Sequence, residues 1–155
     1  MTIQRPKWID DLLQDFGLLI GFDDFTFGET TAIDLAIDDL PLVISHEPGS
    51  SALLIRSPLQ LPVGQPLATL TMLHAANMDS LGAGMGIIAC DIPLGSWVWA
   101  DRIPLAGLTA PHLLDHFENA LKAIRFWHAE VARLIPATEA DTPPAISATD
   151  VLFRL

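Results

Sequence analysis

The chain has 155 residues, with 19 acidic and 8 basic side chains, so its formal net charge is −11 at pH 7. A chain of this length forms one ordinary domain with a hydrophobic core, and its acidity excludes nucleic acid and anionic membrane surfaces as favoured partners, because both require clustered Lys and Arg. A single cysteine excludes a disulfide framework, and no apolar signal-peptide run follows the first residues, so we expect a cytoplasmic protein.

Charged residues are scarce and apolar residues abundant. Charged residues make up 17% of the chain, where about 25% is usual, and apolar residues make up 50%. Between residues 61 and 100 the only charged side chains are Asp79 and Asp91. Prolines interrupt this stretch, and no run approaches the ~20 apolar residues that cross a bilayer, so we expect no membrane insertion. The excess of apolar residues instead indicates exposed surface for protein partners.

The first half of the chain predicts one helix followed by strands. Residues 7–16 carry apolar side chains at helical spacing, and Gly17 is expected to end that helix. Residues 18–27 are typical of a turn and a short extended piece, in which Phe25 and Phe27 share one face. Three strands are then expected, at residues 31–37, 42–46 and 52–57. Their connections are too short for parallel crossovers, so they predict an antiparallel meander.

The second half predicts two helices separated by two strands. A helix of about twelve residues, with Pro66 at its start, is apolar on nearly every side, so a partner's surface is expected to cover its outer face. Strands are expected at residues 85–91 and 97–103. After the helix cap Thr109, apolar residues recur at steps of 4 and 3 as far as Pro136, which predicts one long final helix.

Together these elements predict an α+β fold. We expect a twisted antiparallel sheet of about five to six strands with three helices, in the order α-β-β-β-β-α-β-β-α. Residues 1–135 form one domain in this interpretation, and residues 136–155 form a flexible linker with a short apolar tail. Trp97 and Trp99 share one face of their strand, and the alternation leaves open whether the core or an interface covers that face.

No group of residues in the sequence indicates catalysis, a metal or a cofactor. His112 and His116 stand four residues apart, but no Glu follows His112 as an HExxH motif requires, and no third ligand is placed by the sequence. Cys90 has apolar neighbours, which is typical of a packing residue. We therefore expect a protein that is not an enzyme and has no cofactor.

Two pairs of acids keep one alternative open. Asp23-Asp24 and Asp38-Asp39 lie at predicted turns, where Asp is favoured for its local backbone hydrogen bonds. A small cytoplasmic α+β enzyme or ligand-binding domain would instead need a deep pocket that contains these pairs, His112 or His116.

Several short motifs between residues 7 and 135 occur in a defined order. They are a helix ending in Phe16-Gly17 before Gly21-Phe22, a strand over 33–37 that runs into Asp38-Asp39, a short helix with Ala75-Ala76-Asn77, Gly84-Met85-Gly86 before a strand, and a long helix with Phe126-Trp127. In this order they resemble the class I type III secretion chaperones, the CesT-like family of bacterial export systems.

The resemblance implies a cytoplasmic bacterial chaperone that works as a homodimer without a nucleotide. It implies that the N-terminal chaperone-binding segment of one or more secreted effectors is held extended and export-competent, with the secretion-system ATPase as a further partner. It places the dimer contact on the second helix and neighbouring strands, for which the candidates are Leu67, Leu70, Met72, Leu73, Ala76 and Ile88.

A disordered client gains binding energy by adding strands to a sheet edge and by laying apolar side chains into pockets. The candidate pocket residues for the effector are Leu13, Phe16, Phe25, Phe27 and Val43.

Overall fold

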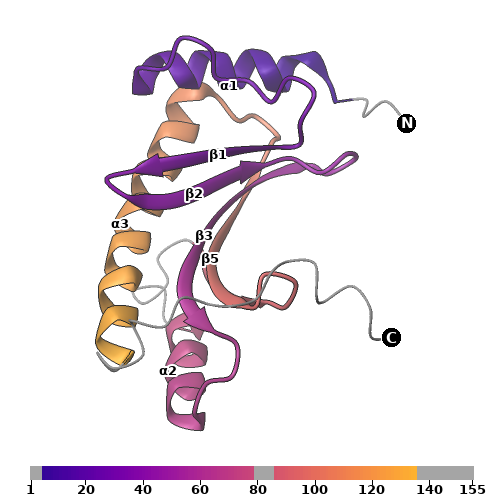
Figure 1. The fold of residues 1–155 in the computed structure, drawn as a ribbon. Helices are drawn as coiled ribbons and strands as arrows, with labels where there is room; N and C mark the ends of the chain where they lie inside the picture. Colours follow the sequence, from indigo (N-terminus) through magenta and orange to yellow (C-terminus); the bar gives the residue numbers. More distant parts are fainter. Residues whose placement is uncertain (1–4, 79–85, 136–155) are drawn as a thin grey trace.

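The computed structural model describes residues 5–78 and 86–135, which form three helices and five strands (Figure 1). In chain order they are α1 (Lys7–Ile20), β1 (Ala32–Ile37), β2 (Leu40–Ser45), β3 (Ala52–Pro62), α2 (Leu67–Met78), β4 (Ile87–Asp91), β5 (Ser96–Pro104) and α3 (Ala110–Leu134). The predicted fold class, an antiparallel sheet with three helices, is confirmed. The expected tail over residues 136–155 lies outside the described residues, so the domain boundary stays a prediction.

The first helix is one turn longer than the sequence indicates. Gly17 lies inside α1 and is buried, and the helix ends instead at Gly21, whose φ of 86° gives a left-handed cap. A Cβ atom at Gly17 would lie 2.3 Å from the Cβ of Phe25. The glycine is therefore used for close approach, since it lets the segment after the helix pass directly across it.

The extended piece expected over residues 18–27 does not join the sheet. Its first residues complete α1, and residues 21–31 cross that helix as an irregular segment before β1 begins. The sheet consequently has five strands, and Phe25 and Phe27 share a buried side, as the alternation indicated.

All neighbouring strands pair antiparallel, in the order β1-β2-β3-β5-β4. The predicted meander is present, and Asp38-Asp39 form its first two-residue turn with φ angles of 49° and 65°. Strand β3 extends beyond residue 57 because Leu59 and Leu61 still reach the core. Its pairing with β5 is irregular between Pro58 and Leu61. The strand order leaves β1 and β4 as the two edges.

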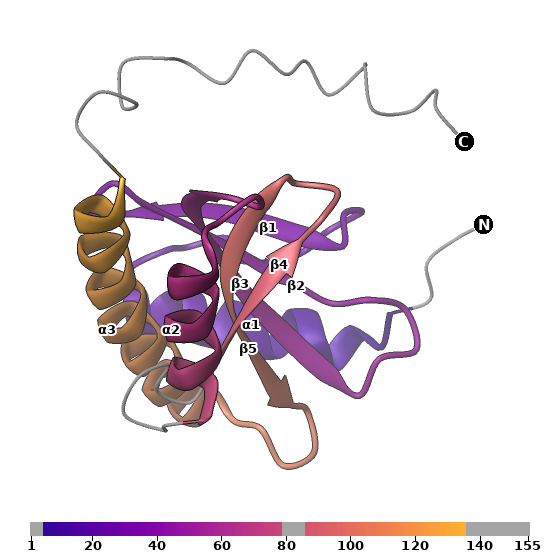
Figure 2. The same ribbon diagram turned by 90° about the horizontal axis from the view of Figure 1, so that it is seen from below.

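The helices pack against one face of the sheet (Figure 2). The predicted stripe of α3 is buried there, and its members are Leu113, Phe117, Ala120, Ile124, Trp127 and Val131. Trp99 lies in this core, and Trp97 is partly buried and packs against it, so both tryptophans face the core. In the part of the chain that the structure describes, no helix covers the opposite face of the sheet.

Helices α1 and α2 lie at opposite ends of the molecule (Figure 1). Helix α1 buries one complete stripe, whereas Leu73 is the one buried residue of α2. Among residues 5–78 and 86–135, no helix is long and apolar enough to cross a membrane.

Candidate protein-binding surfaces

The outward side of α2 carries no Asp, Glu, Lys or Arg and is largely apolar, with Thr71 and His74 as its exposed polar members. Leu67 and Met78 are 79% and 89% exposed, and Thr71 and Ala75 lie between them at helical spacing. The Thr71 hydroxyl donates to the Leu67 carbonyl at 2.8 Å, so its polar group is bonded within the helix. We define Leu67, Thr71, Ala75 and Met78 as the α2 surface. Apolar side chains this exposed indicate contact with another polypeptide.

The structure divides the six predicted dimer residues into two groups. Leu73 and Ile88 are only 1% and 3% exposed, because they attach α2 and β4 to the monomer's own core. Leu70, Met72 and Ala76 are partly buried, and Leu67 is the one exposed residue of the six. The sequence could not separate the groups, because a helix apolar on every side has no periodicity to mark its inner face.

Asn77 fixes the end of α2 to the edge of β4. Its side-chain amide donates to the Ile88 carbonyl, and its oxygen accepts from the Ile88 N–H, both at 2.7 Å. The amide thus takes the place that a neighbouring strand would occupy at Ile88. The outward backbone groups of this residue are bonded within the chain, and the β4 edge is capped there.

The other edge of the sheet is more open. The N–H of His46 donates to the Thr31 carbonyl at 2.9 Å, so the alternating ladder directs the backbone groups of Ala32, Asp34 and Ala36 away from β2. The Ala32 carbonyl accepts from the Thr30 hydroxyl at 2.9 Å, whereas Asp34 and Ala36 are exposed. We call these outward groups the β1 edge. Strand β2 is the main neighbour of β1 among the described elements.

The effector-binding residues expected near α1 lie mostly in the core. Leu13, Phe16, Phe25 and Phe27 are buried, and the Phe16 ring makes edge-on contacts with Phe25 and Phe117 at 5.5 and 5.3 Å between centroids. These four side chains therefore present no surface to a client in this conformation. Burial and client binding both use large apolar residues, so composition cannot distinguish them.

The exposed apolar residues of this end of the molecule are different ones. They are Trp8, Leu18, Leu19 and Phe22. Val43 is half-buried on the sheet face opposite the helices, where its register partners are Asp34 and Arg56. Of the five candidates, Val43 is thus the one that lies at the surface.

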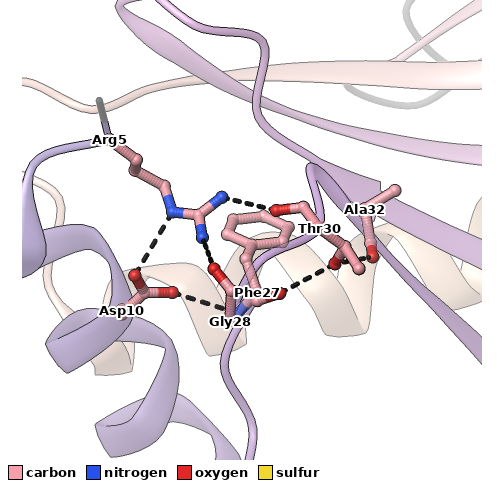
Figure 3. Close-up of polar contacts among 6 residues, drawn as sticks. All are labelled: Arg5, Asp10, Phe27, Gly28, Thr30 and Ala32. Carbon is pink, nitrogen blue, oxygen red and sulfur yellow. Dashed lines mark hydrogen bonds and ion pairs between the residues drawn. The ribbon is translucent and has the colours of Figure 1, made fainter. Parts of the chain in front are cut away.

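A network of polar contacts around Arg5 holds residues 21–31 against α1 (Figure 3). The guanidinium donates to the carbonyls of Thr30 and Gly28 at 2.8 and 2.7 Å, and pairs with Asp10 at 3.3 Å. Asp10 also accepts from the Phe27 N–H at 3.0 Å, and the Arg5 guanidinium lies 4.6 Å from the centre of the Phe27 ring. We call these contacts the Arg5 clamp.

A hollow of about 370 Å³ opens beside the start of α1. Its lining residues are Pro6, Trp8, Ile9, His46, Gly49, Ser50, Ser51, Leu105 and Ala106. It contains neither His112 nor His116, and neither of the paired aspartates, so it is not the pocket that the enzyme or ligand-binding alternative predicted around those residues. His46 contacts the Ser50 carbonyl through Nε2 at 3.0 Å.

Two further histidines contact a buried polar side chain: His128 contacts Ser57, and His116 contacts Asp101. The Ser57 hydroxyl is buried and donates to the Pro41 carbonyl at 2.6 Å, so His128 Nε2, 3.3 Å away, contacts an oxygen whose proton is already engaged. Burial lowers the pKa of His128. This arrangement does not activate a nucleophile, because such a serine must transfer its proton to the base.

The contact between Asp101 and His116 joins β5 to α3. His116 Nδ1 lies 3.4 Å from a carboxylate oxygen of Asp101, which is buried. Burial raises the pKa of Asp101, and the interaction with His116 opposes that shift. Among the residues that the structure describes, no three His, Cys, Asp or Glu side chains are grouped closely enough to hold a metal ion.

Comparison with known proteins identifies the class. The family model described as the Tir chaperone protein (CesT) family matches residues 11–128. None of the curated proteins compared with the chain matches it significantly. The chain belongs to the Tir chaperone protein family, so the predicted relationship to class I type III secretion chaperones is confirmed.

Solved structures show the same fold. A chain of the HopA1–SchA chaperone–effector complex aligns with a TM-score of 0.65 at 22% identity, over 77% of this chain and 91% of that one. A chain of the ExsC–ExsE complex gives a TM-score of 0.67 at 19% identity, over 84% and 96%. A chain of the ExoU–SpcU complex from the type III secretion system of Pseudomonas aeruginosa gives 0.58 at 18% identity, over 82% and 97%.

Proposed function

We propose that this protein is a type III secretion chaperone that binds the N-terminal chaperone-binding segment of one or more effectors and keeps it extended for export. Membership of the Tir chaperone protein family is the observation that carries the proposal. Structures of similar fold come from complexes that include a chaperone–effector pair, which supports an effector as the partner here.

The β1 edge is the surface that we assign to the client. An extended segment that adds a strand there would bond to the outward groups of Asp34 and Ala36, and its alternate side chains would extend the half-buried row of Ile33, Leu35 and Ile37. At the β4 edge the backbone groups of Ile88 are not open to a client in this way, because they are bonded to Asn77. Main-chain hydrogen bonds at an edge suit clients of differing sequence, because every residue except proline supplies them.

The α2 surface is the contact that we assign to a second copy of the chain. A twofold axis through it would place each apolar stripe against its own copy and remove Leu67 and Met78 from water. The partly buried Leu70, Met72 and Ala76 remain candidates at its margin. Leu73 and Ile88 support the contact from inside the monomer.

The remaining parts of the proposal rest on the family. We place the protein in the bacterial cytoplasm, give it no enzymatic activity and no cofactor, and propose the secretion-system ATPase as a further partner. The net charge of −11 keeps a protein with such apolar surfaces soluble and attracts basic client segments.

Strand addition at β1 can be tested by removing one donor. We would co-express the full chain with candidate secreted proteins and quantify the captured client by pull-down and mass measurement. Asp34→Pro should lower capture about tenfold or more, because the N–H that it deletes points away from β2 and serves only an added strand. Asp34→Ala removes the same carboxylate and keeps the donor, so it is the matched control. Equal capture by both variants would contradict the assignment.

A further inference from the structure

The β1 edge has a chemical pattern that a segment of the same chain matches. Ile33, Leu35 and Ile37 face the core side of β1 and are half-buried, while Asp34 and Ala36 are exposed between them. A strand added here needs apolar side chains at alternate positions and, opposite Asp34, a basic one. Prolines are excluded at the positions that donate to the edge.

Residues 151–155, with the sequence Val-Leu-Phe-Arg-Leu, have this pattern. Val151, Phe153 and Leu155 alternate with Leu152 and Arg154, and the segment contains no proline. Arg154 is the only basic residue after position 135. The end of the sequence therefore combines an apolar row with one positive charge on the opposite face.

One antiparallel register satisfies every position. It places Leu155, Phe153 and Val151 opposite Ile33, Leu35 and Ile37, in that order, and Leu152 opposite Ala36. The same register places Arg154 opposite Asp34. It also makes Asp34 and Ala36 the hydrogen-bonded positions, as their outward backbone groups require. A slip by one residue would turn Arg154 toward the core side, so the register is specified.

The connection is long enough. Asp38, next to β1, pairs with Arg125 of α3, and the ten residues from Arg125 to Ile135 extend over about 15 Å of helix. The 15 residues between Ile135 and Val151 can span about 50 Å when extended. The last residues can therefore reach the β1 edge of their own chain from the end of α3.

We propose that residues 151–155 pair with the β1 edge of their own chain, in the place of the client, as a sixth strand beside the sheet β1-β2-β3-β5-β4. This inference rests on the proposed function, since it assigns the client segment and residues 151–155 to the same surface, the β1 edge. A client must displace the tail, so the tail lowers the apparent affinity for weakly matched segments and protects the edge when no client is bound.

Hydrogen exchange of the full-length protein tests the inference without a client. The amides of Asp34 and Ala36 should exchange about fivefold more slowly in the parent than in Phe153→Asp, which places a carboxylate against Leu35. Ile146→Asp makes the same kind of change outside the paired segment and is the matched control. Equal exchange at these amides in the parent and in Phe153→Asp would overturn the proposal.

The register is tested by reversing charges. Asp34→Arg should raise exchange at Ala36 about threefold by repelling Arg154, and adding Arg154→Asp should restore the parent rate. Failure of the double variant to restore protection contradicts the pairing of these two residues. Protection that falls on dilution would show that the tail of another copy supplies the strand, and would also overturn the proposal.

A synthetic peptide of residues 147–155 provides the binding measurement. It should bind Phe153→Asp about fivefold more tightly than the parent, because the parent's own tail competes. Loss of client capture by Asp34→Pro, together with unchanged exchange in the tail variants, would reject this inference and leave the proposed function intact. Equal client capture by Asp34→Pro and Asp34→Ala would instead reject the client site.

Discussion

Helices α1 and α2, at the two ends of the molecule, differ in how many of their apolar residues are buried. At the α1 end a complete helical stripe, with Phe25 and Phe27 from the following segment, is buried, and the Arg5 clamp fixes that segment in place. At the α2 end Leu73 alone of the helix is buried, and Leu67 and Met78 project from the domain. The buried stripe of α1 stabilises the monomer, whereas most of the apolar surface of α2 remains available to another chain.

The difference shows that apolar content does not identify a binding surface. Helix α2 is the more hydrophobic of the two by sequence, yet it contributes the smaller part of the core. Substitutions at the α1 end should therefore change folding, and substitutions on the α2 surface should change association.

The largest effect is expected for Phe16→Ala. Phe16 is fully buried among aromatic rings, so its truncation should lower the free energy of unfolding by about 4 kcal/mol. Urea unfolding at one fixed protein concentration measures this value. Met78→Ala also removes a large apolar side chain, but from the α2 surface, and should leave the unfolding of the monomer within about 0.5 kcal/mol. Similar losses for both variants would remove the contrast between the ends.

The next effect concerns association. Leu67→Asp should weaken the dimer by about 3 kcal/mol, because it places two unpaired carboxylates in the proposed contact. The monomer should remain folded, since Leu67 begins α2 and an acid near a helix N-terminus is favourable. Sedimentation of the variant over a range of concentrations gives the result. Gln14→Asp adds the same charge to the solvent side of α1 and should not change the dimer; a Leu67→Asp protein that remains dimeric would place the contact elsewhere.

A smaller effect is expected from the clamp at the α1 end. The Arg5 side chain is 5% exposed and bonds to two carbonyls and to Asp10, so Arg5→Ala should lower the free energy of unfolding by about 2 kcal/mol. Arg5→Lys should recover less than half of this loss, because an ammonium cannot reproduce the planar fork. Lys7→Ala removes a charge from an exposed neighbour and serves as the control in the same urea titration. A loss equal to that of Lys7→Ala would show that the clamp does not stabilise this end.

The smallest effect on stability is expected at Asp101 of β5, in the sheet between the two ends. Burial raises the pKa of Asp101 above its ordinary 3.8, so folding favours the protonated acid. The stability that this group contributes is complete below pH 3.8 and is lost as the pH rises through the raised pKa. Relative to the parent, Asp101→Asn should therefore gain stability as the pH rises from about 4 through the raised pKa. Urea midpoints over this range provide the measurement, and a difference that does not change with pH would contradict the shift.

Local periodicity was sufficient for most of the fold. The steps of 4 and 3 that begin at Leu113 defined α3, and Pro66 marked the start of α2 within one residue. Gly17 was misleading because a buried glycine inside a helix and a glycine that ends one are the same residue type. Its use depends on Phe25 passing across the helix, which is a tertiary contact that spacing does not reveal.

The surfaces were harder to predict because they depend on which strands are neighbours. That β5 lies between β3 and β4, and that Asn77 caps Ile88, are long-range facts without a local pattern. The aromatic residues around Phe16 were assigned to the client because core and client demand the same chemistry. Leu67 was found because α2 had more apolar surface than a small domain can bury.

The amide of Asn77 also limits how this protein can assemble. A sheet with two open edges can add copy after copy in a head-to-tail manner, which leads to open filaments rather than closed oligomers. With Ile88 bonded to Asn77, the middle of the β4 edge cannot accept a strand at that residue, which opposes head-to-tail pairing of one sheet with the next. A protein with exposed Leu67 and Met78 can in this way bind partners through apolar side chains while pairing between its sheets is opposed.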